Sequence, residues 1–330
     1  MISNQSGPIL AAAVTESIPS ATQSPRFTGI RTFMRVPFDP TPEPGTTDVA
    51  VVGIPFDTAA SFRPGARFGP SAIRDISVLL RPSNQFHSLN AFEHLRVVDA
   101  GDVIAIPGDI QRTYDAIRDR WASLIDAGAV PIGLGGDHSV TLGELRAMHS
   151  KHGPIALVQF DSHSDTWDNY WGLKYTHGTP FRRACEEGLL DTEHSIQFGL
   201  RGSEYSPGDL DETRQLGFKV LTTGDLMGLP AEQAAAEIVR RTAGRPTFLT
   251  FDIDFFDPAF APGTGTPEVG GPTSAYGLQV LRNLAQVNFK GFDVVEVLPA
   301  HDHASITALL AATVVFEFLA LIAVARGRTG

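Results

Sequence analysis

The alternation of short apolar runs with amphipathic segments constrains the fold of this chain most. Five runs have the length and composition of buried strands: 48–54, 129–134, 155–160, 247–251 and 292–297. Helical patterns lie between them. In the segment 109–127 the apolar residues that recur at helical spacing are Ile110, Tyr114, Ile117, Trp121, Leu124 and Ile125. Strands that alternate with helices predict a three-layer α-β-α fold of the α/β class, with a mainly parallel central sheet.

The domain organisation predicted is simple. A chain of 330 residues is long enough for one large domain or two ordinary ones. Because no internal repeat and no interior linker is visible, we predict a single domain over residues 31–330. Residues 1–30 are rich in Ser, Thr, Pro and Ala and are interpreted as a flexible arm. Their start is neither basic nor followed by a sustained apolar core, so a secretory signal is not expected.

Charge and cysteine usage exclude some partners. The chain has 37 acidic and 26 basic residues and a net charge of -11, which disfavours nucleic acid or an anionic membrane surface as a partner. Its single cysteine, Cys185, cannot form an internal disulfide, which indicates a reducing, cytoplasmic setting. The apolar segment 305–325 carries one charge, Glu317, and approaches the length of a membrane span. We interpret it as a buried helix.

Acidic and histidine residues are spaced two apart at predicted strand ends. Asp161, His163 and Asp165 lie in FDSHSDT, and Asp252 and Asp254 lie in FLTFDIDFFDP. Side chains two apart on an extended segment point to the same side, so each string directs its donors to one place. Four buried aspartates repel one another without cations, and carboxylates with imidazoles but no thiolate are typical ligands of manganese-like ions.

These strings follow different strands but share one edge. Asp161 directly follows the strand 155–160, Asp252 follows 247–251, and the GGDH of residues 135–138 follows 129–134. Ligands of parallel α/β sheets bind outside the carboxyl ends of the strands. The sequence therefore predicts that three strand ends converge on one metal site.

The order of GGDHS, FDSHSDT, THGTPFRRA, FDIDFFDPAFAPGTGTPEVGG and EVLPAHDH resembles the ureohydrolases, the family of arginase and agmatinase. The resemblance covers roughly residues 27–325. It is strongest to the agmatinase and guanidinobutyrase branch, and the loop RPGARFGPSAIR at 63–74 also fits. It implies an arginase-like fold and a trimer or hexamer.

The resemblance implies two Mn²⁺ ions per subunit, with Ni²⁺ as the alternative, and six ligands. One ion would be held by His138, Asp161, Asp165 and Asp252, and the other by His163, Asp161, Asp252 and Asp254. Asp161 and Asp252 would then bridge the pair. We expect Asp137 to accept hydrogen bonds at a loop or helix start, and Asp257 to shape a turn.

The chemistry implied is hydrolysis of a guanidino compound to urea and an amine. Two divalent ions lower the pKa of a water between them and so supply a nucleophile for the guanidinium carbon. Asp165 would pass the proton on, and His177 in THGTP resembles the family's proton shuttle. Glu296, at the end of the strand 292–297, would pair with the guanidinium. No dinucleotide fingerprint or phosphate loop is present, so we expect no organic cofactor.

Departures from the family pattern concern the substrate tail. Ser162 replaces the alanine of the usual Asp-Ala-His, a change expected to spare the ligands. Leu298 stands where the agmatinase branch usually has serine, and Ala300 and His301 stand where it has Pro-Tyr. We expect Leu298 to make the pocket more apolar. Trp171 and the rest of the loop 167–175 are the other candidates for tail recognition, since aromatic faces attract both cations and alkyl chains.

Several functions stay open at this level. The leading substrates are agmatine and 4-guanidinobutanoate, followed by 3-guanidinopropanoate and biguanides such as metformin. An alternative of another class is a non-catalytic assembly subunit, which degraded metal ligands would mark. A histone-deacetylase-like hydrolase would need a mononuclear zinc site, and the six-ligand set argues against it.

Overall fold

Eight parallel strands form the central sheet of the computed structural model, which describes residues 18–327. Their order in the sheet is β4-β1-β5-β10-β9-β6-β7-β8. The bounds are β1 Val49–Gly53, β4 Val97–Asp102, β5 Val130–Leu134, β6 Ala156–Phe160, β7 Ile196–Leu200, β8 Lys219–Thr222, β9 Thr247–Asp252 and β10 Phe289–Val295. A separate antiparallel pair consists of β2 Ser83–Asn84 and β3 Leu89–Asn90.

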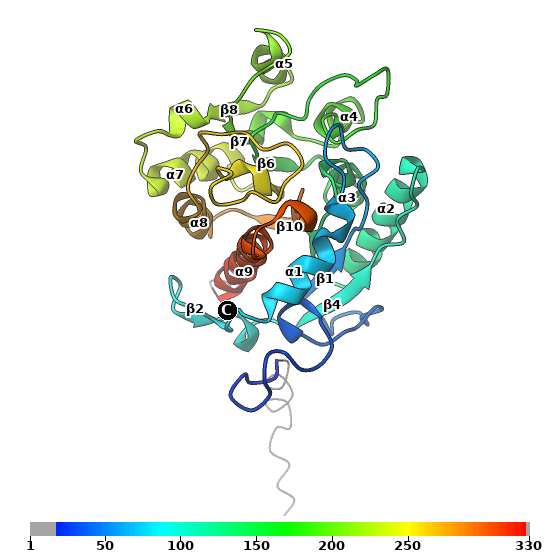
Figure 1. The fold of residues 1–330 in the computed structure, drawn as a ribbon, viewed down its shortest axis with the longest axis vertical. Helices are drawn as coiled ribbons and strands as arrows, with labels where there is room; N and C mark the ends of the chain where they lie inside the picture. Colours follow the sequence, from blue (N-terminus) through cyan, green and yellow to red (C-terminus); the bar gives the residue numbers. More distant parts are fainter. Residues whose placement is uncertain (1–17, 328–330) are drawn as a thin grey trace, which may run out of the picture.

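Helices cover both faces of this sheet (Figure 1). The α-helices are α1 Gly69–Ser77, α2 Ile110–Asp126, α3 Thr141–His152, α4 Pro180–Glu186, α5 Asp209–Gln215, α6 Thr223–Leu226, α7 Ala231–Thr242, α8 Ser274–Arg282 and α9 Ile306–Gly327. The 3-10 helices are η1 Phe33–Arg35, η2 Ala66–Phe68, η3 Ala91–Glu93, η4 His138–Val140, η5 Thr192–His194, η6 Ile253–Phe255 and η7 Pro299–His301.

Two hydrophobic cores, one on each face, define the three layers. Helices α1, α7, α8 and α9 pack on one face, and α2, α3 and α4 pack on the other. Successive strand residues contribute to opposite cores, as Phe248 and Leu249 of β9 do, because side chains alternate along a strand. The predicted three-layer α/β architecture with a parallel sheet is therefore confirmed.

The five predicted strands all form, as β1, β5, β6, β9 and β10. The helix predicted for 109–127 is α2, which Asp109 caps by accepting a hydrogen bond from the N–H of Arg112 at 3.1 Å. Strands β4, β7 and β8 were not predicted. Of these, β8 is a half-buried edge strand and β4 ends in Asp-Ala-Gly-Asp, so neither has the uninterrupted apolar run of a central strand.

Helix α9 is long and apolar enough to cross a membrane by length and composition. In the structure it lies beside α1 (Figure 1) and is largely buried, which confirms its interpretation as a core helix. The single charge within its buried part, Glu317, is 1% exposed and accepts hydrogen bonds from Arg282 at 2.7 and 2.9 Å and from Asn84 at 2.8 Å. The arm predicted for residues 1–30 lies partly outside the described residues.

Candidate metal centre and its cavity

Four adjacent strands bring the predicted ligands together. The strands β5, β10, β9 and β6 are consecutive in the sheet although they are far apart in the chain. His138 follows β5 as the first residue of η4, Asp161 follows β6, and Asp252 ends β9. Glu296 follows β10. Because all four strands run parallel, these residues meet at one edge of the sheet.

The first group of donors surrounds His138. Its Nδ1 lies 3.0 Å from Asp161 Oδ2, 2.9 Å from Asp165 Oδ2 and 3.3 Å from Asp252 Oδ2. The other ring nitrogen, Nε2, is hydrogen-bonded to Thr250 Oγ1 at 2.8 Å. This bond orients the imidazole so that Nδ1 faces the three carboxylates, the usual arrangement of a metal-binding histidine.

The second group contains His163, Asp254 and again Asp161. His163 Nδ1 lies 3.1 Å from Asp254 Oδ2 and 3.7 Å from Asp161 Oδ1. Asp161 therefore directs one carboxylate oxygen to each group, as a bridging ligand would. Asp252 belongs to the first group only. Its other oxygen accepts the N–H of Asp254 at 2.8 Å, as Asp161 Oδ1 accepts the N–H of His163 at 2.6 Å.

The electrostatics of this cluster fit divalent cations. Burial and repulsion by neighbouring carboxylates raise the pKa of Asp161 to about 7 and that of Asp252 well above its ordinary value. His138 Nδ1 and Asp254 Oδ2 are buried and have no hydrogen-bond partner among the described residues. Oxygen and imidazole donors without thiolate suit manganese, nickel or related ions. The residues present therefore fit a pair of divalent ions.

Two further aspartates have the structural roles predicted for them. Asp137 is buried and begins η4, where it accepts hydrogen bonds from the N–H of Ser139 at 3.1 Å and of Ala59 at 3.0 Å. Asp257 accepts three backbone N–H donors, at 2.7 to 3.0 Å, in the turn that follows β9. Neither residue belongs to either donor group.

His177 is held between Glu296 and Ser61. Its Nδ1 lies 2.8 Å from Glu296 Oε1, while its Nε2 accepts the backbone N–H of Ser61 at 2.9 Å and lies 2.7 Å from Ser61 Oγ. Because a backbone N–H can only donate, Nδ1 carries the proton in this arrangement. Burial lowers the pKa of His177, but the hydrogen bond to Glu296 and the negative charges of Glu296, Asp165 and Asp137 together outweigh burial and raise that pKa to about 9.

Glu296 lies beneath the site rather than on its surface. It is 1% exposed, and its Oε1 also accepts the backbone N–H of His138 at 3.0 Å. Its Oε2 is buried and has no hydrogen-bond partner among the described residues. A buried carboxylate oxygen without a partner is costly, so this atom is suited to a cationic donor.

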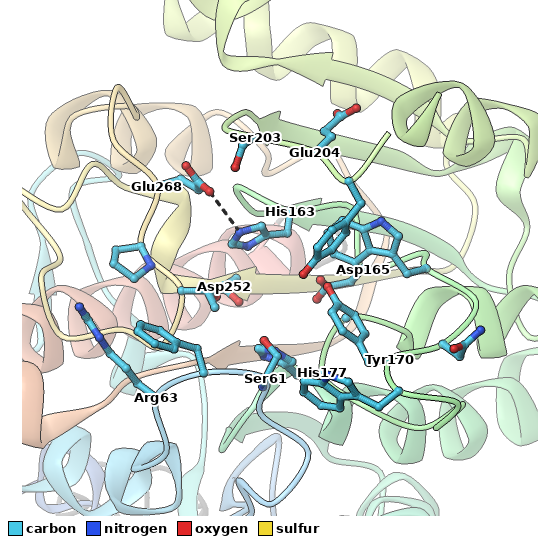
Figure 2. Close-up of a pocket in the computed structure, with 18 residues that line it drawn as sticks. Ser61, Arg63, His163, Asp165, Tyr170, His177, Ser203, Glu204, Asp252 and Glu268 are labelled. Atoms are coloured by element: carbon cyan, nitrogen blue, oxygen red, sulfur yellow. Dashed lines mark hydrogen bonds and ion pairs between the residues drawn. The ribbon is translucent and has the colours of Figure 1, made fainter. Parts of the chain in front are cut away.

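An open cavity of about 850 Å³ lies above the donor groups (Figure 2). Its floor includes His163, Asp165 and Asp252, and its wall includes Ser61 and His177. Four loops complete the lining with Phe62, Arg63, Trp167, Asn169, Tyr170, Trp171, Gly178, Ser203, Glu204, Tyr205, Thr266, Pro267 and Glu268. The cavity thus joins the donor groups to an outer region lined by aromatic and charged side chains.

The residues predicted for tail recognition are placed differently by the structure. Trp171 lines the cavity and is 71% exposed. Leu298 is completely buried and is not among the lining residues, so the structure does not bring it to the cavity. His301 is exposed at the end of η7 and also lies outside the lining. The loop 167–175, and not Leu298, therefore borders the cavity.

Sequence patterns did not identify Ser61, Thr250 or Tyr205. Ser61 contacts a histidine 116 residues away, and Thr250 contacts one 112 residues away. Tyr205 lies in another loop, yet its ring centroid is 5.7 Å from that of Trp167 and 5.9 Å from that of Tyr170. No local spacing marks such contacts, because each depends on how separate loops are brought together.

Fold and side-chain cluster together define an α/β protein with a centre of carboxylate and imidazole donors at the carboxyl edge of a parallel sheet. The model of the arginase family matches residues 47–321, and the chain belongs to this family. It is 43% identical to guanidinopropionase of Pseudomonas aeruginosa, over 94% of this chain and 96% of that protein. It is also 43% identical to agmatinase of Klebsiella pneumoniae, over 89% of this chain and 94% of that protein. The structure of proclavaminate amidino hydrolase from Streptomyces clavuligerus superposes on this chain with a TM-score of 0.87 at 42% identity. The match covers 92% of this chain and 100% of that one.

Proposed function

We propose that this chain is an amidinohydrolase that holds two divalent ions and cleaves a small linear guanidino compound to urea and an amine. The observation that carries this proposal is the position of Asp161, whose two oxygens face separate His-containing groups beneath an open cavity. The relatives named guanidinopropionase and agmatinase support a guanidino substrate.

The six predicted ligands would hold the ions in this proposal. His138, Asp165 and Asp252 would serve the first ion, and His163 and Asp254 the second, with Asp161 between them. The resemblance would make Asp252 a second shared ligand, whereas in the structure it belongs to the first group alone. When bound, such ions lower the pKa of a shared water and so provide a nucleophile at neutral pH. Mn²⁺ is our first choice and Ni²⁺ the alternative.

The chain itself would bind the guanidinium and move protons. Glu296 does not line the cavity but pairs with His177, which does, and its buried Oε2, unpaired among the described residues, is the acceptor we assign to the substrate's N–H groups. Asp165 lines the cavity floor and would receive the proton that the attacking water loses. His177 lines the cavity wall and would protonate the leaving amine.

Ser61 gives His177 a partner in both protonation states. The neutral ring accepts the Ser61 N–H at Nε2. A protonated Nε2 would donate instead to Ser61 Oγ, which lies 2.7 Å away. The ring nitrogen has a partner in both states, and protonation removes only its hydrogen bond from the Ser61 N–H, so the imidazole can exchange a proton at the cavity wall at the cost of one backbone hydrogen bond.

Agmatine and 4-guanidinobutanoate are the substrates we place first, with 3-guanidinopropanoate and biguanides next. The outer cavity contains aromatic rings, the cation Arg63 and the acids Glu204 and Glu268, so its chemistry suits a tail that is both alkyl and charged. We further propose a cytoplasmic enzyme that assembles as a trimer or hexamer. The single thiol, Cys185, supports the first point.

Urea release from a panel of guanidino compounds tests the activity. The panel contains agmatine, 4-guanidinobutanoate, 3-guanidinopropanoate, arginine, guanidine and metformin, each with Mn²⁺ and with Ni²⁺. We expect one compound to be preferred, and Asp165→Ala and His177→Ala to abolish its turnover. His303→Ala is the control, because His303 is exposed and does not line the cavity. Unchanged turnover in both site variants would refute the mechanism.

The same preparations test the alternative of a non-catalytic assembly subunit. Such a subunit would bind fewer than two ions or release no urea from any compound. The complete set of six ligands in two groups favours the enzyme. Bound metal is counted in protein produced with ample manganese and nickel, and two ions per chain are expected.

A further inference from the structure

Ser162 lies between the ligands Asp161 and His163 and has no role in the mechanism proposed above. It is the residue at which this chain departs from the Asp-Ala-His pattern, and its side chain is buried, with 1% of the residue exposed. A buried hydroxyl needs a hydrogen-bond partner, so its contacts indicate what it does.

The hydroxyl holds one oxygen of Asp254. Ser162 Oγ donates to Asp254 Oδ1 at 2.7 Å, and the backbone N–H of Ser162 donates to the same oxygen at 3.1 Å. Asp254 Oδ2 has no hydrogen-bond partner among the described residues and lies 3.1 Å from His163 Nδ1. With Oδ1 occupied by two donors, the carboxylate can turn only Oδ2 toward the second group.

The same hydroxyl also lies against His163. Ser162 Oγ is 3.1 Å from His163 Nδ1, the ring nitrogen that faces Asp254 and Asp161. Since Oγ has a single proton and gives it to Asp254, it can only accept from a protonated Nδ1, so this contact holds His163 in the metal-free protein and is released when Nδ1 binds an ion. One side chain thus connects two second-group donors that follow different strands, β6 and β9, and sets their relative position.

The first group is supported by other residues. His138 is oriented by Thr250 at 2.8 Å, and Asp161 Oδ2 accepts from Gln159 Nε2 at 2.8 Å. Neither contact involves Ser162. An effect of the Ser162 hydroxyl on metal binding is therefore confined to the second ion.

We propose that Ser162 is a positioning residue that arranges Asp254 and His163 for the second ion before this ion binds. A site whose ligands are already oriented loses less entropy on binding, and partners of metal ligands are worth about 10- to 100-fold in metal affinity. The inference rests on the proposed two-ion site, because it assigns Ser162 to one of the two ions.

The inference is tested by adding Mn²⁺ stepwise to metal-free Ser162→Ala protein. Calorimetry and the electron paramagnetic resonance signal of free Mn²⁺ monitor the binding. We expect the Kd of the first ion to stay at its wild-type value and the Kd of the second to rise about 10- to 100-fold. The backbone N–H that holds Asp254 is retained in the variant, so the loss reports on the hydroxyl alone.

Two further variants give the comparison its specificity. Ser164→Ala removes a neighbouring buried hydroxyl that contacts Thr166 and no ligand, so both ions should bind as in the wild type. Thr250→Ala removes the partner of His138 and should weaken the first ion instead. Ser162→Ala should melt at the wild-type temperature when it is metal-free.

Equal second-ion affinity in wild type and Ser162→Ala, or equal weakening of both ions, would overturn the assignment. Failure of the metal-free variant to fold would overturn it too, because the hydroxyl would then serve the fold and not the ion. A wild-type protein that binds fewer than two ions would instead refute the two-ion function itself, and this outcome is visible before any variant is made.

Discussion

Two residues of the site have a backbone conformation that residues other than glycine rarely adopt. Asp165 has φ 52° and Glu296 has φ 62°, both in the left-handed region, where a non-glycine residue costs on the order of 1–3 kcal/mol. Each residue directly follows or closely follows a strand of the sheet. The left-handed conformation turns the chain sharply. The backbone therefore does not continue in the direction of the strand, and the two carboxylates stay at the site.

Replacement of Glu296 by Gln tests the role of this carboxylate. We expect kcat/KM to fall by about 30- to 5000-fold, since the loss of one partner from a buried charge pair costs about 2–5 kcal/mol. The pKa of His177, raised to about 9 by Glu296, should fall, so the pH profile of kcat should move toward lower pH. Steady-state kinetics from pH 6 to 10 measure both effects.

Metal content separates this effect from a loss of ions. Glu296 is in neither donor group, so Glu296→Gln should keep the wild-type number of ions. Glu93→Gln is the control, because Glu93 is exposed and distant from the cavity lining. A kcat/KM within threefold of wild type would contradict the role assigned to Glu296.

Trp171 should affect the substrate tail and not the reaction. It lines the cavity and is 71% exposed, and an aromatic contact of this kind is worth about 0.5–1.5 kcal/mol. In Trp171→Ala we expect KM for the preferred tailed substrate to rise about 2- to 12-fold at unchanged kcat. Leu173→Ala, in the same exposed loop but outside the lining, should leave KM unchanged. Equal KM values in Trp171→Ala and Leu173→Ala would show that Trp171 does not contact the substrate tail.

At the scale of elements, the order of strands brings the site together. β5 and β6 are separated in the sheet by β10 and β9, which come last in the chain. Four consecutive strands therefore each carry a residue of the site, three of them a predicted metal ligand, and the donor groups cannot form before the C-terminal third of the chain has joined the sheet.

Helix α9 depends on its one buried charge. Glu317 accepts hydrogen bonds from Arg282 of α8 and from Asn84 of β2, so it connects three elements. Glu317→Ala leaves Arg282 and Asn84 without this acceptor. Because Arg282 is about one-third exposed and can be rehydrated, we expect a loss near the lower end of the range for broken buried pairs, about 3 kcal/mol in the free energy of unfolding.

Urea unfolding followed by circular dichroism measures this loss, with Glu187→Ala as the control. Glu187 forms a pair with Arg146 at 2.7 Å, but this pair is partly exposed and should contribute less than about 1 kcal/mol. If the two variants are equally stable, Glu317 does not anchor the helix.

At the scale of the whole molecule, the buried carboxylates make the stability of the metal-free protein depend on pH. The pKa of Asp161 is raised to about 7 from an ordinary value of 3.8, and that of Asp252 is raised well above its ordinary value, both by burial and by neighbouring carboxylates. The folded protein then binds more protons than the unfolded chain above about pH 4, so its stability falls as the pH rises through about 7.

Divalent ions should reverse this trend, because they replace the protons among the carboxylates. Each ion present at 100 times its Kd adds about 2.7 kcal/mol of stability. We expect the difference in melting temperature between manganese-loaded and chelated protein to increase from pH 5 to pH 8. Calorimetric melting at several pH values measures it, and Asp161→Asn should reduce the pH dependence of the chelated form. If the difference in melting temperature between the manganese-loaded and chelated protein is constant with pH, the buried carboxylates are not the origin of the pH dependence.

The sequence by itself determined the parts of this protein that depend on neighbours in the chain. The apolar runs of β1, β5, β6, β9 and β10 are local, and so is the spacing of two that directs Asp161 and His163 to one side. The order of the motifs also identified the family. Strands β4, β7 and β8 were missed because polar residues or glycine interrupt the apolar runs of β4 and β7, and β8 is only half-buried.

Only the tertiary structure decided which side chains meet. Ser61 reaches His177 across 116 residues, Ser162 reaches Asp254 across 92, and Leu298 turns into the core instead of the cavity. Such contacts follow from the order of strands in the sheet and from the packing of loops above it. The periodicity of apolar residues along the chain carries no information on strand order or loop packing. It indicates which face of a helix or strand a residue occupies, but not which residue of another element contacts it.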